Sequence, residues 1–150
     1  TAGRLLKAKD MVEEQFLLTY GDGLSDVDVD KLISLHSHSK KIATVTAVRP
    51  PARFGTLEFQ DGIVTSFSEK DPQKVGWING GFFVLDPKVL DYIEGDKTSW
   101  EATPLETIAN QGELAAFEHR GFWQPMDTLR DKNHLEDLWQ SEAAPWKCWQ

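Results

Sequence analysis

Residues 16–23 of the chain read Phe-Leu-Leu-Thr-Tyr-Gly-Asp-Gly. The first five predict a short strand, and an apolar strand without polar alternation is typical of one buried on both faces in an α/β sheet. Gly21 and Gly23 allow the backbone to turn on either side of Asp22. We therefore expect Asp22 at the carboxyl end of a central strand, where open α/β sheets bind their ligands. The alternative is that Gly-Asp-Gly forms only a turn.

Composition and charge limit the class of protein. The chain has 150 residues, 40% of them hydrophobic, which suffices for one globular domain. A formal net charge of -8 argues against a nucleic-acid or membrane partner, because anionic surfaces require clustered Lys and Arg. No stretch has the length of a transmembrane helix. Cys148 is the only cysteine, so an intrachain disulfide is impossible and a cytoplasmic location is expected.

The beginning of the chain is abrupt for a domain of this kind. Residues 4–12 predict an amphipathic helix that leads directly into the strand at 16–20. A strand buried on both faces needs neighbours on both sides. We therefore expect the chain to be the later part of a larger domain.

An Asp-x-Asp-x-Asp run occupies residues 26–30. Asp28 is predicted to cap a helix that starts at Val29. A calcium loop beginning at Asp26 fails, because Lys31 occupies the position where such a loop needs glycine. A second interpretation stays open, in which Asp26 and Asp28 form the metal-binding Asp-x-Asp of a nucleotide-sugar glycosyltransferase.

The middle of the chain predicts three strands. Residues 41–48 are rich in β-branched side chains and predict the first. The loop Arg49-Pro50-Pro51-Ala52-Arg53 ends it, since two consecutive prolines cannot continue a ladder. The two arginines of this loop are either solvated or a clamp for an anion. Residues 54–59 and 63–67 are predicted to form a hairpin, because Gln60-Asp61-Gly62 contains the Asp-Gly turn signal.

Two further stretches carry residue types that bind sugars and phosphates. Glu69 and Lys70 follow the second hairpin strand, either as a solvated pair or as a compact way to hold a sugar hydroxyl and a phosphate. Residues 76–85 begin polar and rich in glycine, and end as a buried strand. Gly80 and Gly81 allow close approach of a neighbouring strand or a ligand.

The last third of the chain brings a second isolated carboxylate. Thr103 and Glu106 predict a capping box at the start of a short helix. A strand over residues 113–119 leads towards Asp127, which stands just before a helix over 129–141. Asp127 is either a functional carboxylate or the cap of that helix. The histidines show no metal-ligand spacing and are assigned to the surface or to a satisfied core: His36, His38, His119 and His134.

Five stretches, in this order along the chain, resemble the sugar-1-phosphate nucleotidyltransferases. They are Tyr20-Gly21-Asp22-Gly23, Arg49-Pro50-Pro51-Ala52-Arg53-Phe54-Gly55, Glu69-Lys70, Trp77-Ile78-Asn79-Gly80-Gly81-Phe82-Phe83 and Phe122-Trp123-Gln124-Pro125-Met126-Asp127-Thr128-Leu129-Arg130-Asp131-Lys132. Each motif alone is weak evidence, but the ordered set covers essentially the whole chain. The resemblance implies a three-layer α/β domain, Rossmann-like with a mixed sheet. Residues 1–150 would be its C-terminal part, without the first strands.

The resemblance also implies a reaction. The chain resembles those family members that transfer a cytidylyl group from CTP to α-D-glucose 1-phosphate. That reaction gives CDP-glucose and pyrophosphate, and it serves bacterial O-antigen synthesis. Catalysis in such a reaction is mostly positioning and charge neutralisation. By resemblance, Asp22 and Asp127 bind Mg²⁺ between the phosphates, which suits a hard cation that takes one or two carboxylates.

By the same resemblance, four residues bind the sugar phosphate. Lys70 would hold the phosphate of glucose 1-phosphate as a catalytic residue, and Glu69 would accept hydrogen bonds from sugar hydroxyls. Asn79 and Gly55 would complete the sugar pocket by hydrogen bonding and close backbone approach.

One departure from the family pattern limits the expected activity. The glycine-rich loop Gly-Gly-x-Gly-[Ser/Thr]-Arg, which binds the triphosphate through backbone N–H groups, is absent from this sequence. We therefore expect the chain alone to have little or no transferase activity, and to leave open strand edges that favour association. A non-catalytic binding or assembly module is the alternative. The resemblance implies a homo-oligomer, with candidate contacts at Trp139, Trp146 and Trp149.

Overall fold

The computed structural model describes residues 2–12, 14–51 and 54–149. They form two compact units, each assembled from three separate segments of the chain. The first unit contains the described residues up to Tyr20, Asp28–Thr46 and Gly81–Phe117. The second contains Gly21–Val27, the described residues of Ala47–Gly80, and those from Glu118 onward. None of the helices in these described parts is long and apolar enough to cross a membrane.

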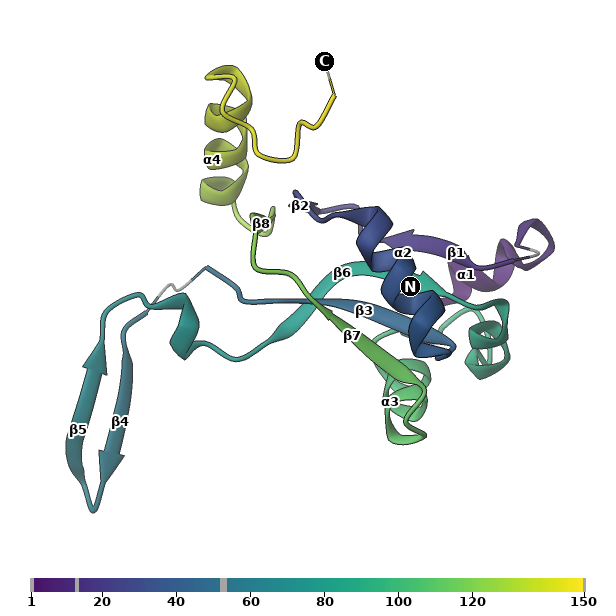
Figure 1. Ribbon diagram of the computed structural model, residues 1–150, viewed down its shortest axis with the longest axis horizontal. Coiled ribbons are helices and arrows are strands. Elements are labelled where there is room, and N and C mark those ends of the chain that lie inside the picture. Colours follow the sequence, from purple (N-terminus) through teal and green to yellow (C-terminus); the bar gives the residue numbers. More distant parts are fainter. Residues whose placement is uncertain (1, 13, 52–53, 150) are drawn as a thin grey trace. The chain divides into compact units, whose positions relative to one another are not determined.

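A four-stranded sheet has the order β1-β6-β3-β7 (Figure 1). Its strands are β1 (Phe16–Thr19), β6 (Ile78–Leu85), β3 (Ala43–Val48) and β7 (Leu114–Glu118). β6 runs antiparallel to β1. β3 and β7 run in the same direction, because the Ala43 N–H donates to the Glu113 carbonyl at their starts and the His119 N–H donates to the Ala47 carbonyl at their ends. The predicted mixed sheet is therefore confirmed.

The prediction that the first strand is central and buried on both faces is wrong in this structure. β1 stands at one end of the sheet order, and its burial alternates along the strand. Phe16 and Leu18 pack against the core, whereas Leu17 keeps 54% of its surface exposed. The physical reason is that a strand paired on one side, with one covered face, buries only every second side chain.

The core of the first unit is built from β3, β6 and the segment that follows β6. Phe83 and Trp100 are its largest members, with ring centroids 5.9 Å apart and an interplanar angle of 81°. Both side chains are about 99% buried, with 1% of their surface exposed. This edge-to-face pair fixes the carboxyl half of β6 in the core.

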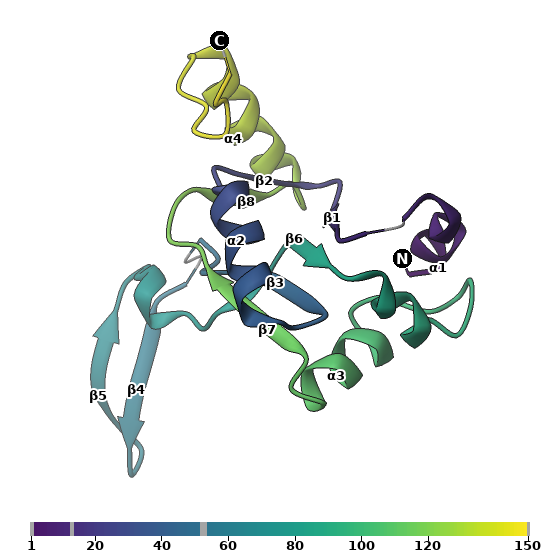
Figure 2. The same ribbon diagram turned by 45° about the vertical axis from the view of Figure 1, so that its right-hand side comes forward.

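The helices of the first unit are partly as predicted. They are α1 (Ala2–Lys7), η1 (Lys9–Met11), α2 (Val29–Ser39), η3 (Pro87–Tyr92) and α3 (Thr103–Asn110) (Figure 2). The predicted cap of α2 is confirmed, since the Asp28 side chain accepts a hydrogen bond from the Lys31 N–H at 3.0 Å. The capping box predicted at Thr103 is wrong. The Ala102 carbonyl already accepts the Glu106 N–H at 3.0 Å, so Thr103 lies inside the helix and Ala102 takes the N-cap without a side-chain bond.

The described residues of the second unit form two antiparallel strand pairs and two helices. β2 (Gly23–Ser25) pairs with β8 (Trp123–Pro125), and β4 (Thr56–Gln60) pairs with β5 (Ile63–Ser68). The short helix η2 (Pro72–Lys74) follows β5, and α4 (Leu129–Gln140) follows β8 (Figure 1). Asp61 and Gly62 turn the predicted hairpin, and both have positive φ angles, 50° and 81°. Two such residues in succession are what a type I′ turn requires.

Candidate functional site

The pairing of β2 with β8 brings the two predicted metal carboxylates to one end of the same ribbon. Gly23 lies opposite Pro125, and the next hydrogen bond runs from the Met126 N–H to the Asp22 carbonyl at 2.7 Å. Asp22 therefore lies beside Met126, and Asp127 is the next residue along the chain. Directly opposed residues of antiparallel strands have Cα atoms about 5 Å apart. The fold thus joins two turns that are distant in sequence.

Asp127 is not the cap of α4. Thr128 takes that position, and its hydroxyl accepts the Asp131 N–H at 3.2 Å while Asp131 Oδ2 accepts the Thr128 N–H at 3.1 Å. Gln124 Nε2 donates to the other oxygen of Asp131 at 3.1 Å. The sequence reasoning missed Asp131, although Thr-x-x-Asp is a recognisable capping pattern. The structural role considered for Asp127 is therefore filled by its neighbours.

Asp127 lines a cavity of about 440 Å³. Small-molecule pockets commonly have volumes of about 300–1,000 Å³ and mainly apolar walls. The other walls come from the loop after β3, the beginning of β6, and β8, and include Pro50, Phe54, Ile78 and Trp123. A carboxylate at the edge of such a cavity can reach a ligand that occupies it.

The residues present fit a magnesium ion shared with a ligand. Within residues 2–12, 14–51 and 54–149, no group of three or more His, Cys, Asp or Glu side chains could hold a metal by itself. Mg²⁺ does not need such a cage, because it is commonly held by one or two carboxylates, waters and substrate phosphates. Asp22 and Asp127 are exposed and supply two carboxylates of this kind.

Gly55 and Glu69 are brought together by the β4–β5 hairpin. Thr56 lies opposite Ser68, so each of the two predicted residues lies one position beyond this pair. A Cβ added to Gly55 would lie 2.9 Å from Glu69 Oε2 and 2.8 Å from the Phe67 ring. The Glu69 carboxylate and the Phe67 ring therefore pack directly against the backbone of Gly55.

Lys70 has an unusual backbone conformation for a residue with a side chain. Its φ angle is 51°, in the left-handed region that costs a non-glycine residue about 1–2 kcal/mol. Lys70 Nζ lies 3.7 Å from Glu69 Oε1, and both side chains are more than half exposed. A surface pair of this kind contributes little to stability. Strained residues cluster at binding sites, which favours a ligand-binding role over a structural one.

Asn79 lies on β6 next to a contact with β8. The indole Nε1 of Trp123 donates to the Gly80 carbonyl at 2.8 Å. Asn79 is partly buried and has polar interactions of its own. The strand that carries Asn79 is therefore tied to the strand that leads to Asp127.

Arg49 is bound to the neighbouring loop rather than solvated. Its guanidinium donates to the carbonyls of Gln73 and Val75, the latter at 3.1 Å, and lies 4.7 Å from the centre of the Trp77 ring. Arg120 lies 5.3 Å from the same ring, and these side chains line a cavity of about 550 Å³. The other arginine of the predicted clamp, Arg53, lies outside the described residues.

Both acids of the alternative Asp-x-Asp motif have structural partners. Asp28 caps α2, and its carboxylate lies 2.8 Å from Lys31 Nζ, which lowers the pKa of Asp28. Asp26 Oδ1 lies 3.0 Å from His119 Nε2. These contacts argue against a glycosyltransferase metal site at Asp26 and Asp28.

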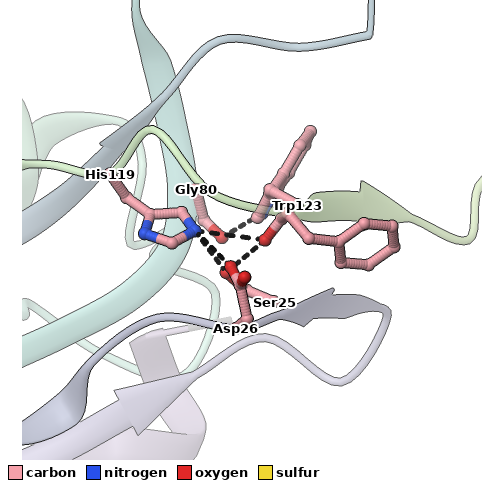
Figure 3. Close-up of polar contacts among 6 residues, drawn as sticks. Ser25, Asp26, Gly80, His119 and Trp123 are labelled. Carbon is pink, nitrogen blue, oxygen red and sulfur yellow. Dashed lines mark hydrogen bonds and ion pairs between the residues drawn. The ribbon is translucent and has the colours of Figure 1, made fainter. Parts of the chain in front are cut away.

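His119 lies near the candidate site. From the sequence it is given only the surface or satisfied-core role predicted for all the histidines. Its side chain is 9% exposed and its Nε2 has polar partners, as expected of a satisfied histidine. Its partners Ser25 and Asp26 are distant in sequence, and no local pattern reveals the contact (Figure 3).

The chain is similar to known proteins over its whole length. The family model described as nucleotidyl transferase matches residues 1–140. Over its whole length the chain is 55% identical to the glucose-1-phosphate cytidylyltransferase of Salmonella typhi, and over 99% of its length it is 46% identical to a probable glucose-1-phosphate cytidylyltransferase of Bacillus subtilis. The chain spans 59% of the length of each of these relatives.

A solved structure shows the same fold. A putative glucose-1-phosphate thymidylyltransferase from Bacillus anthracis matches with a TM-score of 0.65 over 92% of this chain and 60% of its own, at 21% identity. At this identity the likeness concerns the fold alone. The Rossmann-like nucleotidyltransferase fold expected from the sequence is thereby confirmed, and the chain belongs to the nucleotidyl transferase family.

Proposed function

We propose that the chain carries the sugar-phosphate and metal half of an enzyme that forms CDP-glucose and pyrophosphate from CTP and α-D-glucose 1-phosphate. The observation that carries the proposal is the β2–β8 pairing, which brings Asp22 beside Met126 and Asp127. The choice of substrates is supported by the 55% identity to the relative from Salmonella typhi. CDP-glucose made in the bacterial cytoplasm would supply the sugars of a surface polysaccharide.

The proposed reaction is an in-line displacement at phosphorus. A phosphate oxygen of glucose 1-phosphate forms a bond to the α-phosphorus of CTP, the bond to the β-phosphate oxygen breaks, and pyrophosphate leaves with that electron pair. The chain's own residues orient the nucleophile. Lys70 would bind the sugar phosphate, and Glu69, placed against Gly55, would accept hydrogen bonds from the sugar hydroxyls. Orienting two reactants in this way supplies much of the rate enhancement of such a reaction.

Asp22 and Asp127 are the proposed ligands of Mg²⁺. When bound, the ion would neutralise charge on the phosphates. The exposed positions of both carboxylates leave the remaining coordination sites to water and substrate oxygens.

The tryptophans of the C-terminal segment support the proposal of a homo-oligomer only in part. Trp146 packs against Phe122, with ring centroids 5.4 Å apart, and is therefore engaged within the second unit. Trp139 and Trp149 lie 6.4 Å apart and expose 50% and 56% of their surfaces. These two rings are the proposed contact.

Binding of glucose 1-phosphate to the chain tests the proposed function. Isothermal titration calorimetry should show binding of α-D-glucose 1-phosphate that depends on Mg²⁺. Lys70→Ala should weaken it at least about tenfold, since a lost hydrogen bond to a charged group costs about 1.5–3 kcal/mol. Lys88→Ala, which removes an exposed lysine of η3, is the matched control and should change nothing.

Two results would contradict the proposal. Absence of binding with and without Mg²⁺ would favour the non-catalytic module. Equal weakening by Lys70→Ala and Lys88→Ala would show that the phosphate is bound elsewhere. Chromatography of mixtures with CTP, UTP, GTP and dTTP, in a protein that includes the glycine-rich loop, would then test the choice of base.

A further inference from the structure

Ser25, Asp26 and His119 meet at a single nitrogen atom. His119 Nε2 lies 3.0 Å from Asp26 Oδ1, 3.1 Å from Ser25 Oγ and 3.1 Å from the carbonyl oxygen of Phe122 (Figure 3). Ser25 Oγ also donates to the Phe122 carbonyl at 2.8 Å. The His119 side chain is 9% exposed, whereas Asp26 is 38% exposed. The result is a polar cluster at one end of β2 and β8 that is shielded at His119 and open to solvent at Asp26.

The cluster has the residue types of a catalytic triad but not its geometry. In a triad the base contacts the nucleophile through one ring nitrogen and the carboxylate through the other. Here the serine, the carboxylate and the carbonyl all lie on the Nε2 side of His119. No proton can be passed across the ring from Ser25 to Asp26, so the cluster fits a structural connection rather than a nucleophile.

The cluster fastens β2 to the segment between β7 and β8. Its polar contacts join Ser25 and Asp26 to His119 and Phe122, and the Asp26 N–H adds a backbone bond to the Phe122 carbonyl at 3.2 Å. There is no space for a side chain at Gly121, where an added Cβ would overlap Asp26 Oδ1 and lie 2.8 Å from His119 Cε1. The contacts therefore depend on close packing at this end of the ribbon.

The ladder of β2 and β8 has three residue pairs, and one flanking backbone hydrogen bond extends it at each end. A shift by one residue would turn every side chain of a strand to the other face. Asp22 would then lose its place beside Met126, and the distance between the Asp22 and Asp127 carboxylates would change. Contacts that fix the opposite end of so short a ribbon also fix the end with the two acids.

We propose that His119 is a positioning residue for the metal site, because its contacts with Ser25 and Asp26 hold the register of β2 and β8 that places Asp22 beside Met126, the residue before Asp127. The inference rests on the proposed function, since it assigns His119 a task for the metal carboxylates proposed there. His119 touches neither carboxylate, so its effect is transmitted through the backbone of the ribbon.

Hydrogen exchange measured by NMR tests the connection itself. His119→Ala should accelerate exchange of the Met126 amide, which donates to Asp22, at least about tenfold, since the lost contacts include a charge-assisted hydrogen bond. His119→Gln should largely restore protection, because the glutamine amide can donate from a similar position. His38→Ala, at an exposed histidine of α2, is the matched control and should leave this amide unchanged. Asp26→Ala removes the same contact by changing its partner just after β2. If His119→Ala does not fold, Asp26→Ala is used in its place.

Titration with Mn²⁺, a paramagnetic substitute for Mg²⁺, tests the consequence for the metal. Broadening of the Asp22 and Asp127 signals gives the affinity, and His119→Ala should weaken it measurably, because a loosened ribbon no longer holds the two carboxylates in place. His119→Gln should recover most of that affinity. Unchanged Met126 exchange, or faster exchange with unchanged Mn²⁺ affinity, would overturn the role of His119 while leaving the proposed function intact. A wild-type chain whose Asp22 and Asp127 signals do not respond to Mn²⁺ would overturn the metal site and this inference together.

Discussion

The Met126 N–H donates to the Asp22 carbonyl at 2.7 Å, one pair beyond the register of β2 and β8. This bond joins the turn after β1 to the residues just before α4. Neither turn contains a complete binding site by itself. Their meeting brings two isolated acids to adjoining positions, where we propose that a cation and a phosphate ligand are held.

Replacement of Asp127 should leave the stability of α4 almost unchanged, whereas replacement of Thr128 should reduce it. Thr128 and Asp131 form the capping box, and loss of an N-cap side chain costs about 1 kcal/mol. We expect Thr128→Ala to lower the free energy of unfolding by about that amount. Asp127→Ala should change it by less than about 0.5 kcal/mol, as is usual for surface substitutions.

Urea denaturation followed by the NMR signals of α4 measures both effects. A larger loss for Asp127→Ala than for Thr128→Ala would mean that Asp127 supports the helix, which would remove the main structural argument for its availability as a ligand.

Two threonines of β3 offer a matched test of buried hydrogen bonding. Thr44 Oγ1 lies 2.8 Å from His36 Nδ1, and both side chains are buried. Thr46 is also buried, but its hydroxyl has no hydrogen-bond partner among the described residues. Thr44→Val should therefore cost about 1–3 kcal/mol, because it leaves a buried ring nitrogen unpaired. Thr46→Val should be neutral or stabilising.

Thermal unfolding of the two variants in the same buffer makes the comparison directly. Equal losses of stability in both would show that the Thr46 hydroxyl is bonded as well as that of Thr44.

His36 should make the first unit less stable as the pH falls. Burial lowers the pKa of His36, while the Asp86 carboxylate opposes this shift. In the unfolded chain His36 therefore takes up a proton at about pH 6.5, whereas in the folded chain it stays neutral at that pH. Above that pH the group contributes no pH dependence. Below it, stability should decrease until the pH reaches the folded pKa.

The difference in unfolding free energy between wild type and His36→Gln, measured from pH 8 to pH 5, isolates this effect. His134→Gln, at an exposed histidine of α4, is the control. A wild-type curve that stays parallel to that of His36→Gln below about pH 6.5 would refute the assignment.

Gly81→Ala should be strongly destabilising. The φ angle of Gly81 is 79°, and an added Cβ would lie 2.7 Å from Cδ2 of the Tyr20 ring. The Tyr20 N–H also donates to the Gly81 carbonyl at 2.9 Å, so the two segments cannot separate without losing that bond. We expect a loss of about 1–3 kcal/mol in unfolding free energy, measured by denaturation followed by NMR. Gly76→Ala, where an added Cβ meets nothing within 4 Å, is the control.

The elements that sequence predicted well are those specified by neighbouring residues. The Asp61-Gly62 turn requires two positive φ angles, and the Asp28 cap lies three residues from the N–H that it accepts. Such signals are contained in a few consecutive residues. They can be read without knowledge of the tertiary structure.

The features that sequence predicted poorly depend on what a segment packs against. The apolar residues 16–20 do not reveal that Leu17 faces solvent, since this depends on whether another element covers that face of β1. The contact of His119 with Ser25 and Asp26 joins distant segments and leaves no local pattern. The residue types of the candidate site were predicted, whereas the contact that braces it became visible only in the structure.

The most direct test of the account is the binding of Mn²⁺, measured by electron paramagnetic resonance, to wild type and to the variants Asp22→Asn, Asp127→Asn and the double variant. If both acids hold one ion, each single substitution should weaken binding at least about tenfold, and the double variant should lose less than the sum of the two in free energy, as coupled residues do. Asp28→Asn should bind like wild type, since Asp28 caps α2. Unchanged Mn²⁺ affinity in Asp22→Asn and Asp127→Asn, or loss of affinity in Asp28→Asn alone, would contradict the shared metal site.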